Sequence, residues 1–314
     1  NEDWETTDVC DWDGIYCEEG KVIEIYIGQN NIECIPPQEL YTHLDDLKTL
    51  SLYGNAITMS FFDIARAKSL ENLYLDNTAT SELKGLEKAT QLKRLSLRGC
   101  GIDGKFPSEI MSLTNLEYLS LANNRLTGTL PSNLSTLEHL EVLVLSNNEF
   151  MGGLDVAVFS ARMRMVDLSE NNIDGPIPST FLLGMSQNNW IDVDLSNNLL
   201  TGTVPASLGR FNRLNVNLGN NYFVAIDDSL CGKMLWNEGD VGEYGCNALL
   251  CPFKTSAETG RQTSKDDVCV PCNEAEHLGS SMCHKERSSG RSLRIIGRVV
   301  GMAISAMSLS FIIW

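Results

Sequence analysis

The sequence NLEYLSLANNRLTGTLP at residues 115–131 contains an apolar spacing that returns along the chain. Its apolar residues and the second residue of its Asn-Asn pair follow the pattern L-x-x-L-x-L-x-x-N-x-L: Leu116, Leu119, Leu121, Asn124 and Leu126. The 314 residues include 41 leucines and 26 asparagines, an excess that this unit would produce if it recurred. Because a sequence repeat fixes the architecture before any local propensity does, we examine the chain first for further copies.

Nine copies of the unit lie between residues 22 and 223, and the last of them is incomplete. Eight copies begin with an apolar residue: Val22, Leu47, Leu70, Leu92, Leu116, Leu140, Met163 and Trp190. Their asparagine positions hold Asn30, Asn55, Thr78, Cys100, Asn124, Asn148, Asn171, Asn198 and Asn221, at spacings of 22 to 27 residues. A leucine-rich chain without a repeated structural unit would not keep this register.

The residue types of the unit predict its structure. Alternation at L-x-L places apolar side chains on the inner face of a short strand, so that stacked units form a parallel sheet. An asparagine amide after the strand can satisfy backbone groups of neighbouring turns that would otherwise be buried without a partner. Thr78 and Cys100 are small substitutes that can still donate a hydrogen bond.

A second short motif follows the asparagine in four copies, with the form G-x-[apolar]-P: Gly104–Pro107, Gly128–Pro131, Gly175–Pro178 and Gly202–Pro205. With this cassette the chain resembles the plant-type leucine-rich-repeat family. The resemblance implies an α/β solenoid, a curved horseshoe with a parallel β-sheet on its concave face and disulfide-capped ends. Residues 58–63, 79–84 and 151–156 lack the G-x-x-P step, so we expect an irregular second strand or turn there.

The repeats divide the chain into four parts. Residues 1–20 are expected to form an amino-terminal cap, and residues 21–230 the nine repeats. Residues 231–284 are expected to form a carboxy-terminal cap with a cysteine-rich module, followed by a basic and then hydrophobic segment over residues 285–314. Polar lids at both ends are required because the terminal coils of a solenoid have no neighbour to cover them.

The amino-terminal cap is indicated by the motif W-x5-C-x-W-x-G-x-x-C, formed by Trp4, Cys10, Trp12, Gly14 and Cys17. It resembles the caps of plant-type extracellular repeat proteins, and that resemblance implies a Cys10–Cys17 disulfide with tryptophans over the first coil. Disulfide-dense caps are typical of secreted proteins. Two unrelated thiols near a loop are the alternative.

Six cysteines follow the repeats within 53 residues: Cys231, Cys246, Cys251, Cys269, Cys272 and Cys283. Resemblance to an L-C-G cap implies a Cys231–Cys246 pair. Resemblance to small extracellular C-P…C-x-P-C modules implies Cys251–Cys269 and Cys272–Cys283. Six cysteines allow 15 connectivities, among which the sequence does not choose. A zinc site with His284 is an alternative, because C-x-x-C is also a ligand spacing, although no second C-x-x-C is present.

Two further cysteines, Cys34 and Cys100, lie three repeats apart. Stacked strands are separated by about 4.8 Å, so three steps exceed the ~7 Å between Cα atoms that a disulfide can span. Both are therefore predicted to be buried free thiols.

The carboxy-terminal thirty residues differ in charge from the rest. Residues 285–314 carry five basic residues and one acidic residue, whereas residues 1–284 carry 19 basic and 40 acidic residues. The apolar run 299–314 is shorter than the ~20 residues of a spanning helix. It is a truncated membrane helix, a lipid-anchor signal after Ser288, or an irrelevant terminus. Since the chain starts at Asn1, we expect that a signal peptide precedes it.

No catalytic motif is present among the nucleophile-elbow, zinc-protease, phosphate-loop and kinase patterns. Asp192 and Asp194 could be imagined as a glycosidase pair, but acids that are solvated or face a ligand explain them more simply. A formal net charge of −17 argues against a nucleic-acid partner. We therefore expect a protein that is not an enzyme and has no cofactor or metal.

The non-leucine strand positions of the concave face are the expected ligand-binding surface. Tyrosine and arginine, which anchor interfaces, gather on the first five repeats, and acids gather on the seventh and eighth. The predicted binding residues are Tyr26, Tyr53, Tyr74, Arg94, Arg98, Tyr118, Asp167, Asp192 and Asp194. A chance grouping at positions that tolerate any residue is the alternative.

The single N-glycosylation sequon, at Asn133, is expected on the convex side, away from this surface. The sequence thus predicts an extracellular or cell-surface recognition module for a protein, peptide or glycan. We expect it to be receptor-like, membrane-attached through its carboxy-terminal segment, and to signal with a possible co-receptor. The alternative is a secreted inhibitor of a cell-wall-degrading enzyme, resembling polygalacturonase-inhibiting proteins.

Overall fold

The computed structural model describes residues 8–33, 36, 41, 44–156, 159–281 and 283. These residues belong to one compact unit that ends at Cys283. Trp4, Cys34, His284 and the segment 285–314 with Ser288 lie outside the described residues, and so do the expectations that concern them. No helix among the described residues is both long and apolar enough to cross a membrane.

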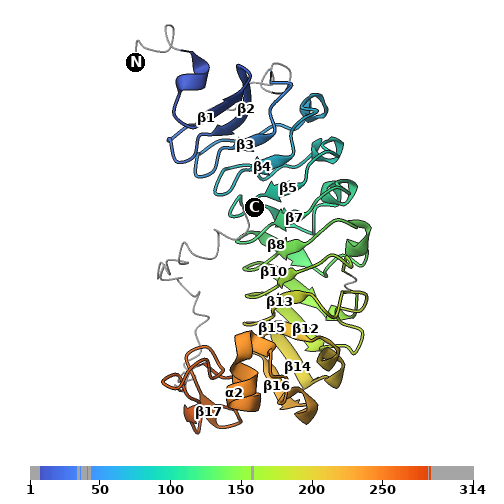
Figure 1. Cartoon of the computed structure of the whole chain (residues 1–314), viewed down its shortest axis with the longest axis vertical. Coiled ribbons are helices and arrows are strands. Elements are labelled where there is room, and N and C mark those ends of the chain that lie inside the picture. Colours follow the sequence, from blue (N-terminus) through green and yellow to red (C-terminus); the bar gives the residue numbers. More distant parts are fainter. Residues whose placement is uncertain are drawn as a thin grey trace. The chain divides into compact units, whose positions relative to one another are not determined.

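Nine coils stack in chain order, each contributing one strand to a ten-stranded sheet (Figure 1). Strand β1 (Ile15–Glu18) pairs antiparallel with β2, and the remaining neighbours pair in parallel. The parallel strands are β2 (Lys21–Tyr26), β3 (Thr49–Ser51), β4 (Asn72–Tyr74), β5 (Arg94–Ser96), β7 (Tyr118–Ser120), β9 (Val142–Val144), β11 (Met165–Asp167), β13 (Trp190–Asp194) and β15 (Arg213–Asn217). The predicted solenoid with a parallel sheet is confirmed.

A second, six-stranded parallel sheet starts at the fourth coil. It contains β6 (Asp103–Gly104), β8 (Arg125–Gly128), β10 (Glu149–Gly152), β12 (Asn172–Pro176), β14 (Leu199–Val204) and β16 (Tyr222–Ile226). No strand forms at 58–63 or 79–84, as expected, but β10 forms at the start of 151–156, where irregularity was predicted. That prediction was wrong for the strand because Gly152, at φ +80°, keeps the cassette glycine although the proline is missing.

Short 3-10 helices, rather than α-helices, form the backs of the described coils. They are Ile64–Arg66, Leu86–Lys88, Ser108–Ser112, Leu134–Thr136, Leu154–Val156 and Ala206–Arg210. The caps add 3-10 helices at Val9–Asp11, Asp228–Leu230, Trp236–Gly239 and Gly245–Ala248, the α-helix α2 (Asp240–Tyr244), and a small hairpin of β17 (Thr255–Ser256) and β18 (Val270–Pro271). Inward aliphatic side chains from all the coils form one continuous buried cluster.

The asparagine positions connect successive coils, as predicted. Asn148 donates through Nδ2 to the carbonyl oxygens of Leu121 and Leu145, at 2.9 and 3.0 Å, and its Oδ1 accepts from the Leu126 N–H at 3.0 Å. The substitutes make fewer such bonds: Thr78 Oγ1 and Cys100 Sγ both donate to the carbonyl of Leu75, at 2.8 and 3.1 Å. A buried amide therefore holds two neighbouring coils in register at once.

The residue just before each asparagine position is left-handed in all nine coils. These residues are Gln29, Gly54, Asn77, Gly99, Asn123, Asn147, Glu170, Asn197 and Asn220, with φ between +53° and +67°. Asparagine and glycine tolerate this conformation best, which explains the Asn-Asn pairs of four coils and the glycines at Gly54 and Gly99. The chain direction changes here, at the end of each strand.

The amino-terminal cap covers the first coil with β1, which pairs with β2. The Cys10–Cys17 disulfide, the pair implied by the sequence resemblance, closes the cap. Trp12 is half-buried within it.

The carboxy-terminal end is closed by side chains that the repeat pattern did not predict. Trp236 is fully buried, and its Nε1 donates to the carbonyl of Phe211 at 3.0 Å. Asn237 Oδ1 accepts from the N–H of Val216, on the last strand of the sheet, at 2.7 Å. The cap thus supplies a side-chain acceptor where the strand of a further coil would supply a carbonyl.

Residues beyond Cys251 also pack on the last coil. The N–H of Asn220 donates to the carbonyl of Gly279 at 3.0 Å, as equivalent residues donate to the next coil elsewhere. Leu278 in turn donates to Phe223, and Ser281 donates to the Asn220 side chain at 3.0 Å. The cysteine-rich module is therefore part of the cap and covers the end of the solenoid.

Candidate functional site

The outward face of the ten-stranded sheet presents three residues from each short strand and its end. In-register pairing aligns Asn72, Arg94 and Tyr118 in one row and Tyr74, Ser96 and Ser120 in the next. Parallel strands lie about 4.8 Å apart, so side chains in one row are direct neighbours. The predicted binding residues are therefore brought together wherever their coils are adjacent.

The aromatic–basic group consists of Tyr26, Tyr53, Tyr74, Arg94, Arg98 and Tyr118 on the first five coils. Tyr26 and Tyr53 are 42% and 40% exposed, so both rings are available to a ligand. Tyr16 of the cap, which sequence reasoning did not include, meets Tyr26 edge-on with ring centroids 5.8 Å apart. This contact extends the aromatic surface onto the cap.

Arg94 and Arg98 form no ion pair with any described carboxylate. Asp76 lies on the neighbouring coil but pairs with neither guanidinium. Its Oδ1 accepts from the backbone N–H of Arg98 at 2.8 Å and from the Ser96 hydroxyl. Burial raises the pKa of the Tyr118 phenol, which keeps it neutral and able to donate. Arg94 thus lies between Asn72 and Tyr118, and the Arg98 guanidinium lies against the Asn123 side-chain amide, with no described carboxylate paired to either arginine.

The acidic group consists of Asp167, Asp192 and Asp194 on the seventh and eighth coils. Two of these acids hold the local backbone: Asp167 Oδ1 accepts from Ser169 N–H at 3.0 Å, and Asp194 Oδ1 accepts from Ser196 N–H at 2.8 Å. Burial raises the pKa of Asp194, opposed by its hydrogen bonds from Ser196 and Asn217. Both carboxylates are largely committed to the fold.

The aromatic–basic and acidic groups do not form one site. Strand β9 lies between them and presents Val142 and Val144. The outward face therefore contains two separate polar regions divided by an apolar strip.

Trp190 lies on the outward face, which corrects its placement at an apolar core position of the eighth repeat. The indole is 40% exposed, whereas Ile191 is fully buried. Strands β13 and β15 are five residues long, and their side chains alternate strictly, so Arg213 also faces outward beside Trp190. The alternation in WIDVDL and RLNVNL, residues 190–195 and 213–218, was the signal in the sequence.

Side chains around Trp190 are joined by hydrogen bonds. Its Nε1 donates to Asp192 Oδ1 at 3.2 Å, and Asn215 Nδ2 donates to the same oxygen at 3.0 Å. One row further along, Asn217 Nδ2 donates to Asp194 Oδ2 at 3.0 Å. Acid–amide pairs thus bridge β13 and β15 in two consecutive rows.

The cysteine-rich module meets the ninth coil beyond the end of β15, at residues 259–261, named here the overhang. A Cβ placed on Gly219, at the outward end of the ninth coil, would lie 2.6 Å from the carbonyl oxygen of Thr259. Gly260 in turn leaves no room for a side chain against Gly279. Burial lowers the pKa of Arg261, and the negative charges of Asp240 and Asp194 oppose that shift.

The remaining predicted residues have structural surroundings. The structure pairs Cys231 with Cys246, Cys251 with Cys269 and Cys272 with Cys283, so neither cysteine of the C-x-x-C motif is a free thiolate for zinc. Cys100 is a buried free thiol, as predicted, and burial raises its pKa. Asn133 is exposed beside a 3-10 helix on the back of its coil.

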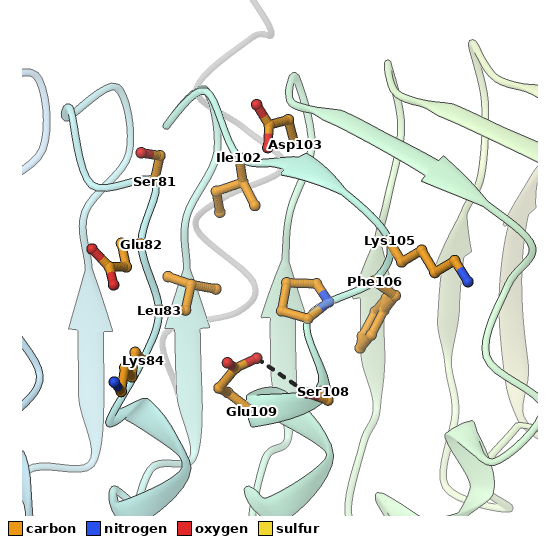
Figure 2. A pocket seen from close by; sticks show the side chains of 11 residues that line it. Ser81, Glu82, Leu83, Lys84, Ile102, Asp103, Lys105, Phe106, Ser108 and Glu109 are labelled. Atoms are coloured by element: carbon orange, nitrogen blue, oxygen red, sulfur yellow. Dashed lines mark hydrogen bonds between the residues drawn. The ribbon is translucent and has the colours of Figure 1, made fainter.

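A groove lies away from this face, between residues 81–84 and 102–109, where the second sheet begins (Figure 2). Leu83, Ile102 and Phe106 lie among charged side chains of both signs, and Ser108 donates to Glu109 at 3.4 Å. Among the described residues, β6 pairs with β8 alone, because the third coil forms no strand beside it. Sequence reasoning did not include this groove among the candidate sites.

Comparison with known proteins finds matches within the coils. The leucine-rich-repeat family models match residues 90–150 and 189–211. Receptor-like protein 9a of Arabidopsis thaliana is 32% identical over 128 residues, which are 36% of this chain and 14% of that protein. The receptor-like kinase TMK4 of the same plant is 32% identical over 75 residues, 24% of this chain and 8% of the kinase. The chain thus spans a small part of these relatives' length.

Solved structures agree with the family matches. The ectodomain of the receptor kinase GASSHO1/SCHENGEN3 from Arabidopsis thaliana, in complex with CASPARIAN STRIP INTEGRITY FACTOR 2, gives a TM-score of 0.54 at 29% identity over 65% of this chain and 24% of that chain. The plant peptide hormone receptor RGFR1, in complex with RGF2, gives 0.57 at 21% identity over 72% and 44%, a likeness of fold. The chain thus contains leucine-rich repeats at residues 90–150 and 189–211, and with its nine stacked coils and second sheet it is similar to plant receptor-like proteins and to the ectodomain of a plant receptor kinase.

Proposed function

We propose that this chain is a receptor-like recognition module that binds an extended peptide on the outward face of its ten-stranded sheet. The aromatic–basic group supplies the anchor. A ligand carboxylate pairs with Arg94 or Arg98, and the tyrosine rings cover the neighbouring ligand side chains.

One observation carries the proposal: two arginines lie among tyrosines on an exposed sheet face, without an ion pair to any described carboxylate. Arg94 lies in register between Asn72 and Tyr118, and Tyr74 occupies the next row. An unpaired guanidinium attracts a carboxylate in bidentate geometry. Tyrosine and arginine are also the residue types that carry most of the binding energy in interfaces.

The spacing of the coils favours an extended ligand. Adjacent strands present equivalent outward positions about 4.8 Å apart, and an extended chain advances about 3.3 Å per residue. A peptide lying across β3, β4, β5 and β7 would therefore advance by about three residues for every two coils. The likeness to GASSHO1/SCHENGEN3, which was solved in complex with CASPARIAN STRIP INTEGRITY FACTOR 2, supports this kind of ligand.

The remaining parts of the proposal concern location. Four disulfides favour an oxidising, extracellular environment. We include attachment to a membrane through residues 285–314 and a co-receptor that contacts the bound peptide. The exposed back of the coils at Asn133 is suited to a glycan that leaves the ligand face open.

The test uses a displayed library of random twelve-residue peptides with free carboxy termini. We expect the chain to select a peptide family whose affinity falls at least tenfold in the variant Tyr74→Ala/Arg94→Ala. The melting temperature should change little, because neither side chain is fully buried.

The matched control is Tyr222→Ala/Arg125→Ala, which removes one tyrosine and one arginine from the second sheet. Equal affinity in the double variant and the control would overturn the proposal. Failure to select any peptide family would overturn it as well.

A further inference from the structure

The second sheet has one edge that the chain covers and one that it leaves open. At the covered edge, the N–H of Leu278 in the carboxy-terminal cap donates to the carbonyl of Phe223 on β16 at 3.2 Å. At the open edge, β6 pairs with β8 and with no other described strand. We propose that the open edge of β6 binds an extended segment of a partner protein, which adds a strand to the sheet. This site is separate from the peptide surface proposed above and does not depend on it.

The backbone of β6 leaves a donor and an acceptor free for that strand. The carbonyl of Ile102 accepts from the N–H of Arg125 at 2.8 Å, so it faces β8. Backbone groups alternate in direction along a strand, and the N–H and the carbonyl of Asp103 therefore face away from β8. Neither group has a hydrogen-bond partner within the described part of the chain. Free groups at a sheet edge form a template for pairing with another chain.

The third coil does not fill the place beside β6. It bonds to the second coil instead, since the Ala79 N–H donates to the Ile57 carbonyl at 2.8 Å. No hydrogen bond joins residues 79–84 to residues 101–109, all of which the structure describes. The space between the two runs is the groove of about 420 Å³ noted above (Figure 2). Its volume is in the range of ligand sites, ~300–1,000 Å³.

The walls of the groove favour a single extended segment over a second copy of this protein. Residues 81–84 line one side and residues 102–109 the other. A second molecule would have to bring its own β6 to the edge, but that strand lies behind an identical wall. A flexible segment has no such wall and can enter the groove. Leu83 and Ile102, which are both buried, give it an apolar surface to pack on.

The charges of the groove favour a segment with one basic side chain. Figure 2 shows Glu109 between the two runs, and its carboxylate forms no ion pair with a described cation. Asp103 is paired with Arg125 at 3.6 Å. The remaining lining charges are Glu82 and Lys84, one of each sign on the opposite wall, and Lys105, whose side chain lies over Gly128 of β8. Glu109 is therefore the charge that a ligand cation would meet.

The experiment selects from a displayed library of random ten-residue segments, each flanked by linkers so that no terminus is free. The bait is the whole chain with Tyr74→Ala/Arg94→Ala, so that failure of the peptide surface proposed above does not affect the result. We expect selected segments to protect the Asp103 amide from hydrogen exchange. Their affinity should fall about fivefold in Glu109→Gln, as loss of one partly exposed ion pair predicts.

The decisive variant is Asp103→Pro, which removes the N–H at the open edge. Proline is accepted at the first residue of an edge strand, and Asp103 is the first residue of β6, so we expect the fold to be kept. The affinity should fall at least tenfold relative to Asp103→Ala, the matched control, which keeps the N–H. Methylation of the backbone nitrogens of a selected segment, which leaves the protein unchanged, should reduce its affinity at least tenfold as well.

Three results would overturn the proposal. The first is that the library yields no segment that protects the Asp103 amide. The second is equal affinity of the selected segments for Asp103→Pro and Asp103→Ala, or binding that survives methylation of the segment. The third is a dimer of the chain in sedimentation that Asp103→Pro dissociates, which would assign the edge to a second copy.

Discussion

The first five coils and the last two differ in how they use the same outward positions. Strands β3, β4, β5 and β7 are three residues long and present tyrosines and arginines with few mutual bonds. Strands β13 and β15 are five residues long, and their acids and amides bond to each other across the strands. The longer strands coincide with a cap that packs against the sheet. The comparison suggests a division of roles within one solenoid: side chains of the first five coils stay available to a ligand, whereas those of the last two coils bond to each other beside the carboxy-terminal cap.

The largest effect on stability should come from removing Trp236, the buried side chain that attaches the carboxy-terminal cap to the last coils. Trp236→Ala is expected to lower the free energy of unfolding by about 3–5 kcal/mol, because it empties a fully buried site and removes the bond to the Phe211 carbonyl. Denaturant unfolding measures the change, and hydrogen exchange should show it concentrated on β13 and β15. Protection lost equally at β3 would contradict the division into two ends. Phe253→Ala, on the exposed side of the cap, serves as the control.

A smaller loss of stability should distinguish a coil that has asparagine at the asparagine position from a coil that has threonine there. Asn198→Ala is expected to cost about 2–4 kcal/mol, since it leaves the Ile173 N–H buried without a partner and removes one of the two amide bonds to the Leu168 carbonyl, which keeps its bond from Asn171. Thr78→Ala, which removes a hydroxyl bonded to Leu75, should cost about 1 kcal/mol. Equilibrium unfolding of both variants measures the difference. Equal losses of unfolding free energy in the two variants would show that the stacking of the coils does not depend on the asparagine amide.

The smallest effect concerns a single charge on the last two coils. Burial raises the pKa of Asp194 in the folded chain above its ordinary value of 3.8, so ionisation of this group opposes folding. Its unfavourable contribution is absent below that value and fully present above the raised pKa. Asp194→Asn should therefore gain melting temperature relative to the parent as pH rises from below 3.8 towards neutrality. Asp174→Asn, on the exposed second sheet, is the control, and parallel pH profiles for Asp194→Asn and the parent would reject the idea.

Much of the fold could be predicted because each coil repeats one physical requirement. Leucines at alternating positions fixed the strands, and Asn148 and its equivalents could be assigned their backbone bonds from residue type alone. The left-handed residue before each asparagine was missed, although its glycines and asparagines were visible. Strand β10 was misjudged because the missing proline received more weight than Gly152.

The candidate site was predicted less completely. The register of the outward rows followed from the repeat, so Arg94 and Tyr118 were expected to be neighbours, and they are. Trp190 was placed in the core because the repeat template was applied where a strict alternation already described a longer strand. The overhang depends on contacts between residues some forty positions apart, such as Gly219 and Thr259, and no local pattern encodes them.

The docking of Gly279 and Asn237 on the last coil has a consequence for solubility. A parallel sheet built from identical-looking coils ends in a row of backbone groups that would accept another strand, including the first coil of a second molecule. Here the N–H groups of Val216 and Asn220 are already occupied from within the chain. The cap and its module therefore block end-to-end association of two molecules through this edge of the sheet.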